Sequence, residues 1–295
     1  MSNDRLREAI RLYDRFTHDG MDRRAFMARL TRLAGGAAAA NALLLAIAAD
    51  PASAQIVPED DPRVKTGPAQ WPVAGGRAMS GYMAAPEGDN VPRPVVIVVH
   101  ENRGLHAHIR DVARRLALAG YVAVAPDWLS TAGGTPADED RAREMISALD
   151  MGQAVADGVA TIRNVGRGRM STGKVGLVGF CWGGAMVNRL AVAAGNLLSA
   201  GVVFYGPAPS PAEAPRVAAP LLIHLAERDQ RVNATALPWV VALRNAGKDV
   251  RAINYHGVDH AFHNDTSQAR YNAQAARRAW ATTLDFFNRH LRAGA

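Results

Sequence analysis

One cysteine stands in a setting that would make it a nucleophile. The chain has a single cysteine, Cys181, within the run Gly179-Phe180-Cys181-Trp182-Gly183-Gly184, after an apolar stretch and before a predicted helix. Glycines let a strand and a helix approach closely in a tight turn, which lifts the residue between them above the sheet edge. A helix N-terminus also favours a thiolate. The motif predicts a nucleophile elbow; the alternative is a buried cysteine packed beside glycines.

Two further residues supply what such a nucleophile needs. Asp229 follows the apolar run 221–225, and His260 follows the run 251–255, so the order along the chain is cysteine, aspartate, histidine. A histidine can take the thiol proton and later activate water, while the aspartate orients the imidazole. Alone, Asp229 would be a turn residue and His260 a core histidine. Together the three residues indicate covalent catalysis.

The elements that must position these residues alternate along the chain. Short apolar runs predict strands at 95–99, 121–125, 175–179, 202–205 and 221–225, and the run 251–255 adds a further strand. Helical patterns follow at 109–119, 138–147, 152–164, 184–194, 237–246 and 269–290. This alternation predicts one α/β domain with a doubly wound, mostly parallel sheet and helices on both faces. Sites in such sheets form beyond the carboxyl ends of the strands.

The motifs resemble those of the dienelactone hydrolase (carboxymethylenebutenolidase) family, within the α/β-hydrolase superfamily, over roughly residues 78–292. The matching segments are His100-Glu101-Asn102-Arg103-Gly104, the cysteine run, Arg228-Asp229-Gln230-Arg231-Val232 and His260-Ala261-Phe262. The resemblance implies an α/β-hydrolase fold. It also implies a hydrolase that cleaves a carboxylic ester or lactone through a thioester acyl-enzyme, with no cofactor.

The resemblance gives roles to residues outside the Cys-His-Asp triad. Glu101 corresponds to an active-site glutamate that contacts the resting thiol and helps form the thiolate; the alternative is a surface carboxylate paired with an arginine. The backbone N–H groups of Trp182 and Asn102 would form the oxyanion hole.

The sequence departs from the family where the substrate's carboxylate should bind. An arginine is expected four residues after the catalytic histidine, and Asn264 stands there. An amide cannot reproduce a bidentate guanidinium clamp. Arg103, Arg141 and Arg143 are the candidate substitutes, of which we favour Arg103 and Arg143. The substrate therefore stays open, and a general acyl esterase or a non-catalytic binding protein of the same fold remains an alternative.

The first 54 residues have the layout of an export signal rather than of folded structure. A polar leader reaches Arg23-Arg24-Ala25-Phe26, a weakly apolar run covers 33–49, and Ala52-Ser53-Ala54 offers a cleavage site. The paired arginines resemble a twin-arginine signal, a route that carries folded proteins. We expect cleavage after Ala54 and a periplasmic product with no stable membrane span, the export machinery being a transient partner. The alternative is an uncleaved membrane anchor, although the apolar run is short for one.

Composition narrows the remaining possibilities. The 295 residues are 48% hydrophobic and 21% charged, as in a globular protein, and one cysteine allows no disulfide within the chain. The net charge of +7 comes from scattered arginines, so nucleic-acid binding is not expected. Histidines at 106 and 108, and at 256, 260 and 263, have ligand-like spacings without further support, so no metal is expected.

Residues 55–77 are expected to be an arm or linker before a domain over 78–295, whose partner is a small-molecule ester or lactone. The oligomeric state is left open.

Overall fold

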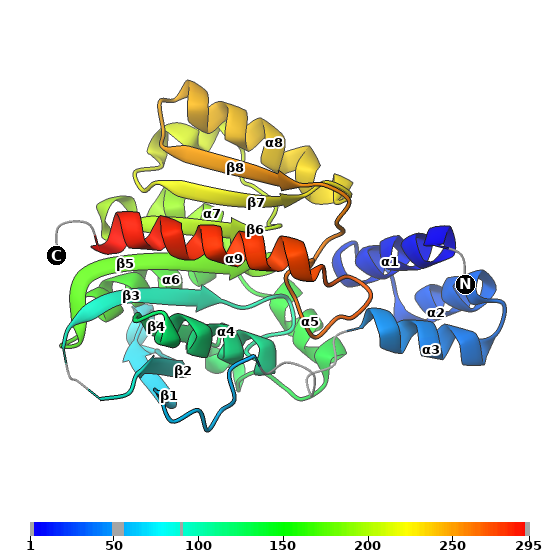
Figure 1. The fold of residues 1–295 in the computed structure, drawn as a ribbon, viewed down its shortest axis with the longest axis horizontal. Helices are drawn as coiled ribbons and strands as arrows, with labels where there is room; N and C mark the ends of the chain where they lie inside the picture. Colours follow the sequence, from blue (N-terminus) through cyan, green and yellow to red (C-terminus); the bar gives the residue numbers. More distant parts are fainter. Residues whose placement is uncertain (1–2, 49–55, 89–90, 293–295) are drawn as a thin grey trace.

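The parallel sheet that the sequence predicts is present. The computed structural model describes residues 3–48, 56–88 and 91–292, and Figure 1 shows its fold. One eight-stranded sheet has the order β1-β2-β4-β3-β5-β6-β7-β8. The strands are β1 (Val64–Pro72), β2 (Ala78–Pro86), β3 (Arg93–Val99), β4 (Val122–Pro126), β5 (Ser171–Phe180), β6 (Ala200–Phe204), β7 (Leu221–Ala226) and β8 (Val250–Tyr255). From β4 to β8 all neighbours are parallel, and β1 and β2 are antiparallel additions at one edge.

Helices cover both faces of this sheet, which confirms the doubly wound α/β architecture. They are α4 (Ala107–Leu118), α5 (Glu139–Ser147), α6 (Met151–Gly166), α7 (Trp182–Ala193), α8 (Gln230–Asn245) and α9 (Ala273–Phe287). One apolar core contains Val96 and Val98 of β3 together with residues of α4 and α9. The other contains Ile97 and Val99 with residues of α6, α7 and α8. Because successive strand residues point to opposite faces, a continuous apolar run such as β3 feeds both cores.

The segment 55–77, expected to be an arm or linker, contains an edge strand. Strand β1 pairs with β2 from Val64 opposite Pro86 to Pro72 opposite Ala78. Pro68 and Gly67 hide this strand in the sequence, since both residues are disfavoured inside a sheet. At an edge the missing N–H of a proline is tolerated.

Residues 3–47 contain three helices, where the sequence suggested no folded structure. Helices α1 (Asn3–His18), α2 (Arg23–Ala34) and α3 (Ala37–Ile47) enclose a small core in which Phe16 stacks on Phe26 at 4.4 Å. Figure 1 shows them beside the end of the sheet to which the parallel strands point. The expected cleavage point after Ala54 lies outside the described residues.

Among the described residues, no single helix has the features of a membrane span. None of these helices is long and apolar enough to cross a membrane; α2 and α3 pass that test only together, and they are bent by 108° at their junction.

A buried carboxylate holds the start of the domain against α4. Asp111 is fully buried and accepts hydrogen bonds from the backbone N–H groups of Ile56 and Val57, at 3.2 and 2.8 Å. It also accepts hydrogen bonds from the guanidinium of Arg115, which itself is buried and reaches Asp265 at 2.6 Å. Two backbone N–H groups and the guanidinium of Arg115 therefore stabilise the negative charge of Asp111.

Replacing this carboxylate should cost stability. Asp111→Asn leaves the buried guanidinium of Arg115 with one partner fewer, so we expect the free energy of unfolding to fall by about 3–5 kcal/mol in urea titrations. Asp285→Asn is the matched control, because Asp285 forms an exposed pair with Arg289 and should change stability by about 1 kcal/mol or less. Equal losses in the two variants would contradict this assignment.

Candidate active site

Cys181 occupies the strained turn between β5 and α7. Its φ is 55°, a left-handed value that few side-chain-bearing residues adopt, and α7 begins at the next residue. A Cβ on Gly179 would lie 2.2 Å from the carbonyl oxygen of Gly183, and one on Gly183 would lie 2.3 Å from that of Val99. These glycines are therefore required by the close approach of the backbones. The predicted elbow geometry is present.

His260 and Asp229 meet beside the elbow. Asp229 follows β7 and His260 lies in the loop after β8, and their Oδ2 and Nδ1 atoms are 2.5 Å apart. The other oxygen of Asp229 accepts the backbone N–H of Val232 at 3.1 Å, which caps α8 and fixes the carboxylate. Both side chains are buried. The structure thus brings together the three residues that the sequence singled out.

Charge in this pocket favours a protonated imidazole. Burial alone would lower the pKa of His260, but the negative charges of Asp229 and of the Cys181 thiolate outweigh it and raise this pKa to about 10. The imidazolium in turn helps to hold the pKa of Asp229 below its usual value against the opposing effect of burial. The arrangement can therefore stabilise a thiolate next to an imidazolium.

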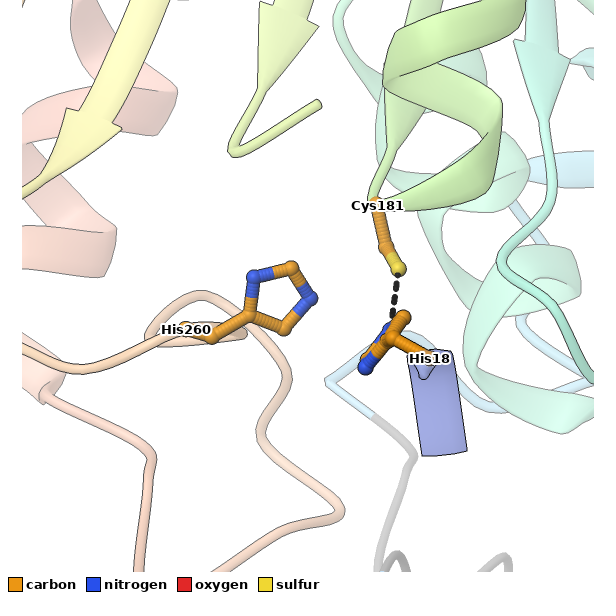
Figure 2. A group of neighbouring side chains, drawn as sticks. All are labelled: His18, Cys181 and His260. Atoms are coloured by element: carbon orange, nitrogen blue, oxygen red, sulfur yellow. Dashed lines mark hydrogen bonds between the residues drawn. The ribbon is translucent and has the colours of Figure 1, made fainter. Parts of the chain in front are cut away.

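A second histidine, which the sequence did not indicate, contacts the nucleophile. His18, at the end of α1, places Nε2 3.0 Å from Cys181 Sγ (Figure 2). It belongs to the segment expected to be removed, and the local sequence around it has no signal for a site. Only the tertiary packing of α1 on the domain places it there.

Glu101 is buried, not on the surface, and it lines the same cavity as Cys181. Its Oε2 accepts a hydrogen bond from the side-chain amide of Asn264 at 2.8 Å. The residue at the expected clamp position is therefore in contact with the glutamate. An amide donor holds that carboxylate without neutralising it.

The two proposed oxyanion-hole residues lie at the same end of the sheet. Trp182 is the first residue of α7, so its backbone N–H has no acceptor within the helix. Asn102 follows Glu101 in the loop after β3, and its side-chain amide donates to the carbonyl oxygen of Thr17 at 2.9 Å. Helix α1 thus contacts the loop that carries Asn102.

The candidate clamp arginines bind protein groups. Arg103 is buried, donates to the hydroxyl of Tyr13 and pairs with Glu139 at 3.1 Å. Arg143 pairs with Asp140 at 2.6 Å and stacks 4.2 Å above the ring of Phe16. Arg141 pairs with Glu144 at the surface.

The cavity at Cys181 is nearly closed by α1. Its volume is about 20 Å³, which is room for about one water molecule. Residues of α1 and of the hydrolase domain line it together: Tyr13, Thr17, His18, Glu101, Asn102, Arg103, Cys181, His260, Ala261 and Arg270. Arg270, which the sequence did not single out, also reaches Asp14 of α1 at 3.4 Å. With α1 in this position the sulfur is buried and has little free space beside it.

Known proteins share this domain. Residues 79–291 match the dienelactone hydrolase family. A Yersinia pestis protein named "putative carboxymethylenebutenolidase" is 33% identical over 230 residues, which cover 73% of this chain and 85% of that protein. An Escherichia coli K12 protein of the same name is 32% identical over 258 residues, covering 82% and 94%.

A solved structure supports the same family. A Klebsiella pneumoniae structure titled "putative dienelactone hydrolase" superposes with a TM-score of 0.69 at 30% identity, covering 76% of this chain and 98% of that one. Helices α1 to α3 lie outside the residues that match the family. The chain therefore belongs to the dienelactone hydrolase family and is a hydrolase of the dienelactone hydrolase type with an α/β-hydrolase fold.

Proposed function

We propose that this protein cleaves a carboxylic ester or lactone through a thioester on Cys181. The observation that carries the proposal is the elbow cysteine beside an imidazole whose Nδ1 lies 2.5 Å from the Asp229 carboxylate. A thiolate is the reactive form of cysteine, and an imidazolium held by a buried aspartate stabilises it.

The reaction has two halves. The Cys181 thiolate attacks the acyl carbon, the C–S bond forms, and the C–O bond breaks as His260 gives its proton to the leaving oxygen. His260 then takes a proton from water, the hydroxide attacks the thioester, and the acid leaves as the C–S bond breaks. Cys181 returns to the thiolate and His260 to the imidazolium.

Backbone donors and one carboxylate complete the proposed machinery. The N–H groups of Trp182 and Asn102 would bind the oxyanion, and the loss of one such donor typically costs about a hundredfold or more in rate. Glu101, held by Asn264, would help to keep the thiol deprotonated as substrate enters. Arg103 is the better candidate for a substrate carboxylate, because it lines the cavity, whereas Arg143 does not.

We also propose export by the twin-arginine route. Arg23 and Arg24 are exposed on α2 in the folded chain, where export machinery could reach them. Cleavage after Ala54 would remove all three N-terminal helices and, with them, the wall that closes the cavity at Cys181. The periplasmic product would then have an open site.

Loss of the nucleophile tests the reaction. In the form that begins after Ala54, Cys181→Ala should reduce hydrolysis of activated phenyl esters at least about a thousandfold, because no thioester can form. Ser147→Ala, an exposed change at the end of α5, is the control and should keep the wild-type rate. If wild-type protein is no faster than Cys181→Ala, the chain is a binding protein or an enzyme with another nucleophile.

Loss of the aspartate tests the ion pair. Asp229→Asn removes the charge that raises the pKa of His260, so this pKa should fall and the thiolate should be less populated near neutral pH. In the form that begins after Ala54, we expect alkylation of Cys181 by iodoacetamide at pH 7 to slow by about tenfold or more. Asp259→Asn, which alters a pair with Arg228, should leave the rate unchanged. Equal rates in all three proteins would argue against a His260-dependent thiolate.

The export proposal has its own test. Replacing Arg23 and Arg24 together by lysine keeps the charge of α2 but removes the twin-arginine pair, so the precursor should accumulate in the cytoplasm. The same double change at Arg29 and Arg32 of that helix is the control. Cell fractionation and the mass of the periplasmic species report the result, with cleavage after Ala54 expected. Unchanged distribution in the first variant would exclude this route.

A further inference from the structure

Three potential metal ligands meet where α1 covers the elbow. His18, Cys181 and His260 each offer one ligand atom, and these atoms all lie within 4.8 Å of one another. Figure 2 shows the two imidazoles approaching the sulfur from different sides. No other group of three such residues with this geometry occurs in the ranges that the structure describes. The spacings noted in the sequence, around His106 and His256, do not form such a group.

Oxygen atoms orient both imidazoles. His18 Nδ1 lies 2.8 Å from the carbonyl oxygen of Asp14, which can only accept, so this nitrogen carries the proton. His260 Nδ1 lies 2.5 Å from the carboxylate of Asp229. Hydrogen bonds of this kind fix the tautomer of metal-binding histidines and leave Nε2 with its lone pair. In both residues Nε2 is thus the free nitrogen at the cluster.

The cluster has too few protons for its acceptors. If the thiol is protonated, its one S–H group can serve one imidazole, and the other Nε2 lacks a donor. If the proton lies on His260, the lone pair of His18 Nε2 faces a thiolate at 3.0 Å. A cation would satisfy all three atoms at once.

We propose that the full chain binds a divalent transition metal of the zinc type through His18, Cys181 and His260. A thiolate and two imidazoles suit zinc and disfavour calcium or magnesium, which take oxygen ligands. Three protein ligands leave a fourth position for water, and the cavity of about 20 Å³ has room for it. Asp229, on the far side of His260, would serve as the carboxylate that supports a metal-bound histidine.

Metal binding would inhibit ester hydrolysis, a consequence that rests on the proposed function. The metal displaces the one proton that Cys181 and His260 share, which passes to solvent, and binds the sulfur and His260 Nε2, so the electron pair that would attack the ester is engaged. The bound thiolate is also protected from oxidation. Cleavage after Ala54 would remove His18, leave two ligands and weaken the site. The metal would therefore be held by the precursor and released by the mature enzyme.

Cobalt makes the site visible without an activity assay. Reduced, chelator-treated full chain is titrated with Co²⁺, and we expect a thiolate-to-cobalt charge-transfer band in the near ultraviolet with visible bands of tetrahedral cobalt. Zinc should displace the cobalt. In calorimetry, His18→Ala should weaken zinc binding by about 100-fold or more, because one of three ligands is lost. His256→Ala, a change at an exposed histidine paired with Glu227, is the matched control and should bind zinc as the wild type does.

The outcomes separate this proposal from the hydrolase proposal. Absence of the cobalt bands in the wild type, or bands unchanged in His18→Ala, overturns the metal site; circular dichroism shows whether the variant is folded, and His18→Gln repeats the test with a larger side chain. Ester hydrolysis is measured separately, in chelator, on the form that begins after Ala54, in which α1 no longer covers Cys181. Hydrolysis by that form without cobalt bands in the full chain overturns only the metal site, whereas cobalt bands in the full chain without hydrolysis by that form support the metal site and overturn only the proposed reaction.

Discussion

The site depends on backbone contacts that exclude side chains. Strands β5 and β6, the loop after β3 and the first turn of α7 converge on Cys181, and a Cβ on Gly206 would lie 2.4 Å from the carbonyl carbon of Gly184. This crowding forces the left-handed φ of Cys181 and aims its sulfur past the sheet edge. The stability of the two apolar cores offsets that strain, as in other functional turns. A larger residue at these glycines would separate the helix from the strand and move the nucleophile.

The parallel sheet also places Asp229 and His260, the two partners of Cys181, next to each other. Strands β7 and β8 are neighbours, so the residues that follow them, Asp229 and His260, emerge side by side. Asp229 also caps α8, which means that the start of a helix and the orientation of the imidazole depend on one carboxylate. One buried group thus links the fold to the chemistry.

Most of the sheet and the group of Cys181, Asp229 and His260 could be predicted from the sequence, and the features that were missed have physical causes. The strands before Cys181 and Asp229 end in fully buried residues, so their apolar runs are visible in the sequence, whereas β8, before His260, is a partly exposed edge strand. Strand β1 was missed because an edge position accepts Pro68, which a pattern treats as a break. His18 was missed because its contact with Cys181 spans 163 residues and leaves no local trace. Arg103 was expected to face substrate, but Tyr13 of α1 occupies its donor group.

The N-terminal helices are attached in a way that suits a removable unit. Their apolar core is their own, formed by residues from Ala9 to Ile47, and Ala269 is the one domain residue that packs against it among those described. The contacts across the junction are polar: Arg23 with Asp140, Arg270 with Asp14, and Ser267 with the carbonyl oxygen of Ile47. The Arg23–Asp140 pair is exposed and contributes about 1 kcal/mol or less, whereas the contacts of Arg270 and Ser267 are largely buried. Release of α1 to α3 would therefore open the cavity at Cys181 while leaving both cores of the domain covered, which separates the folding of the hydrolase from the control of its nucleophile.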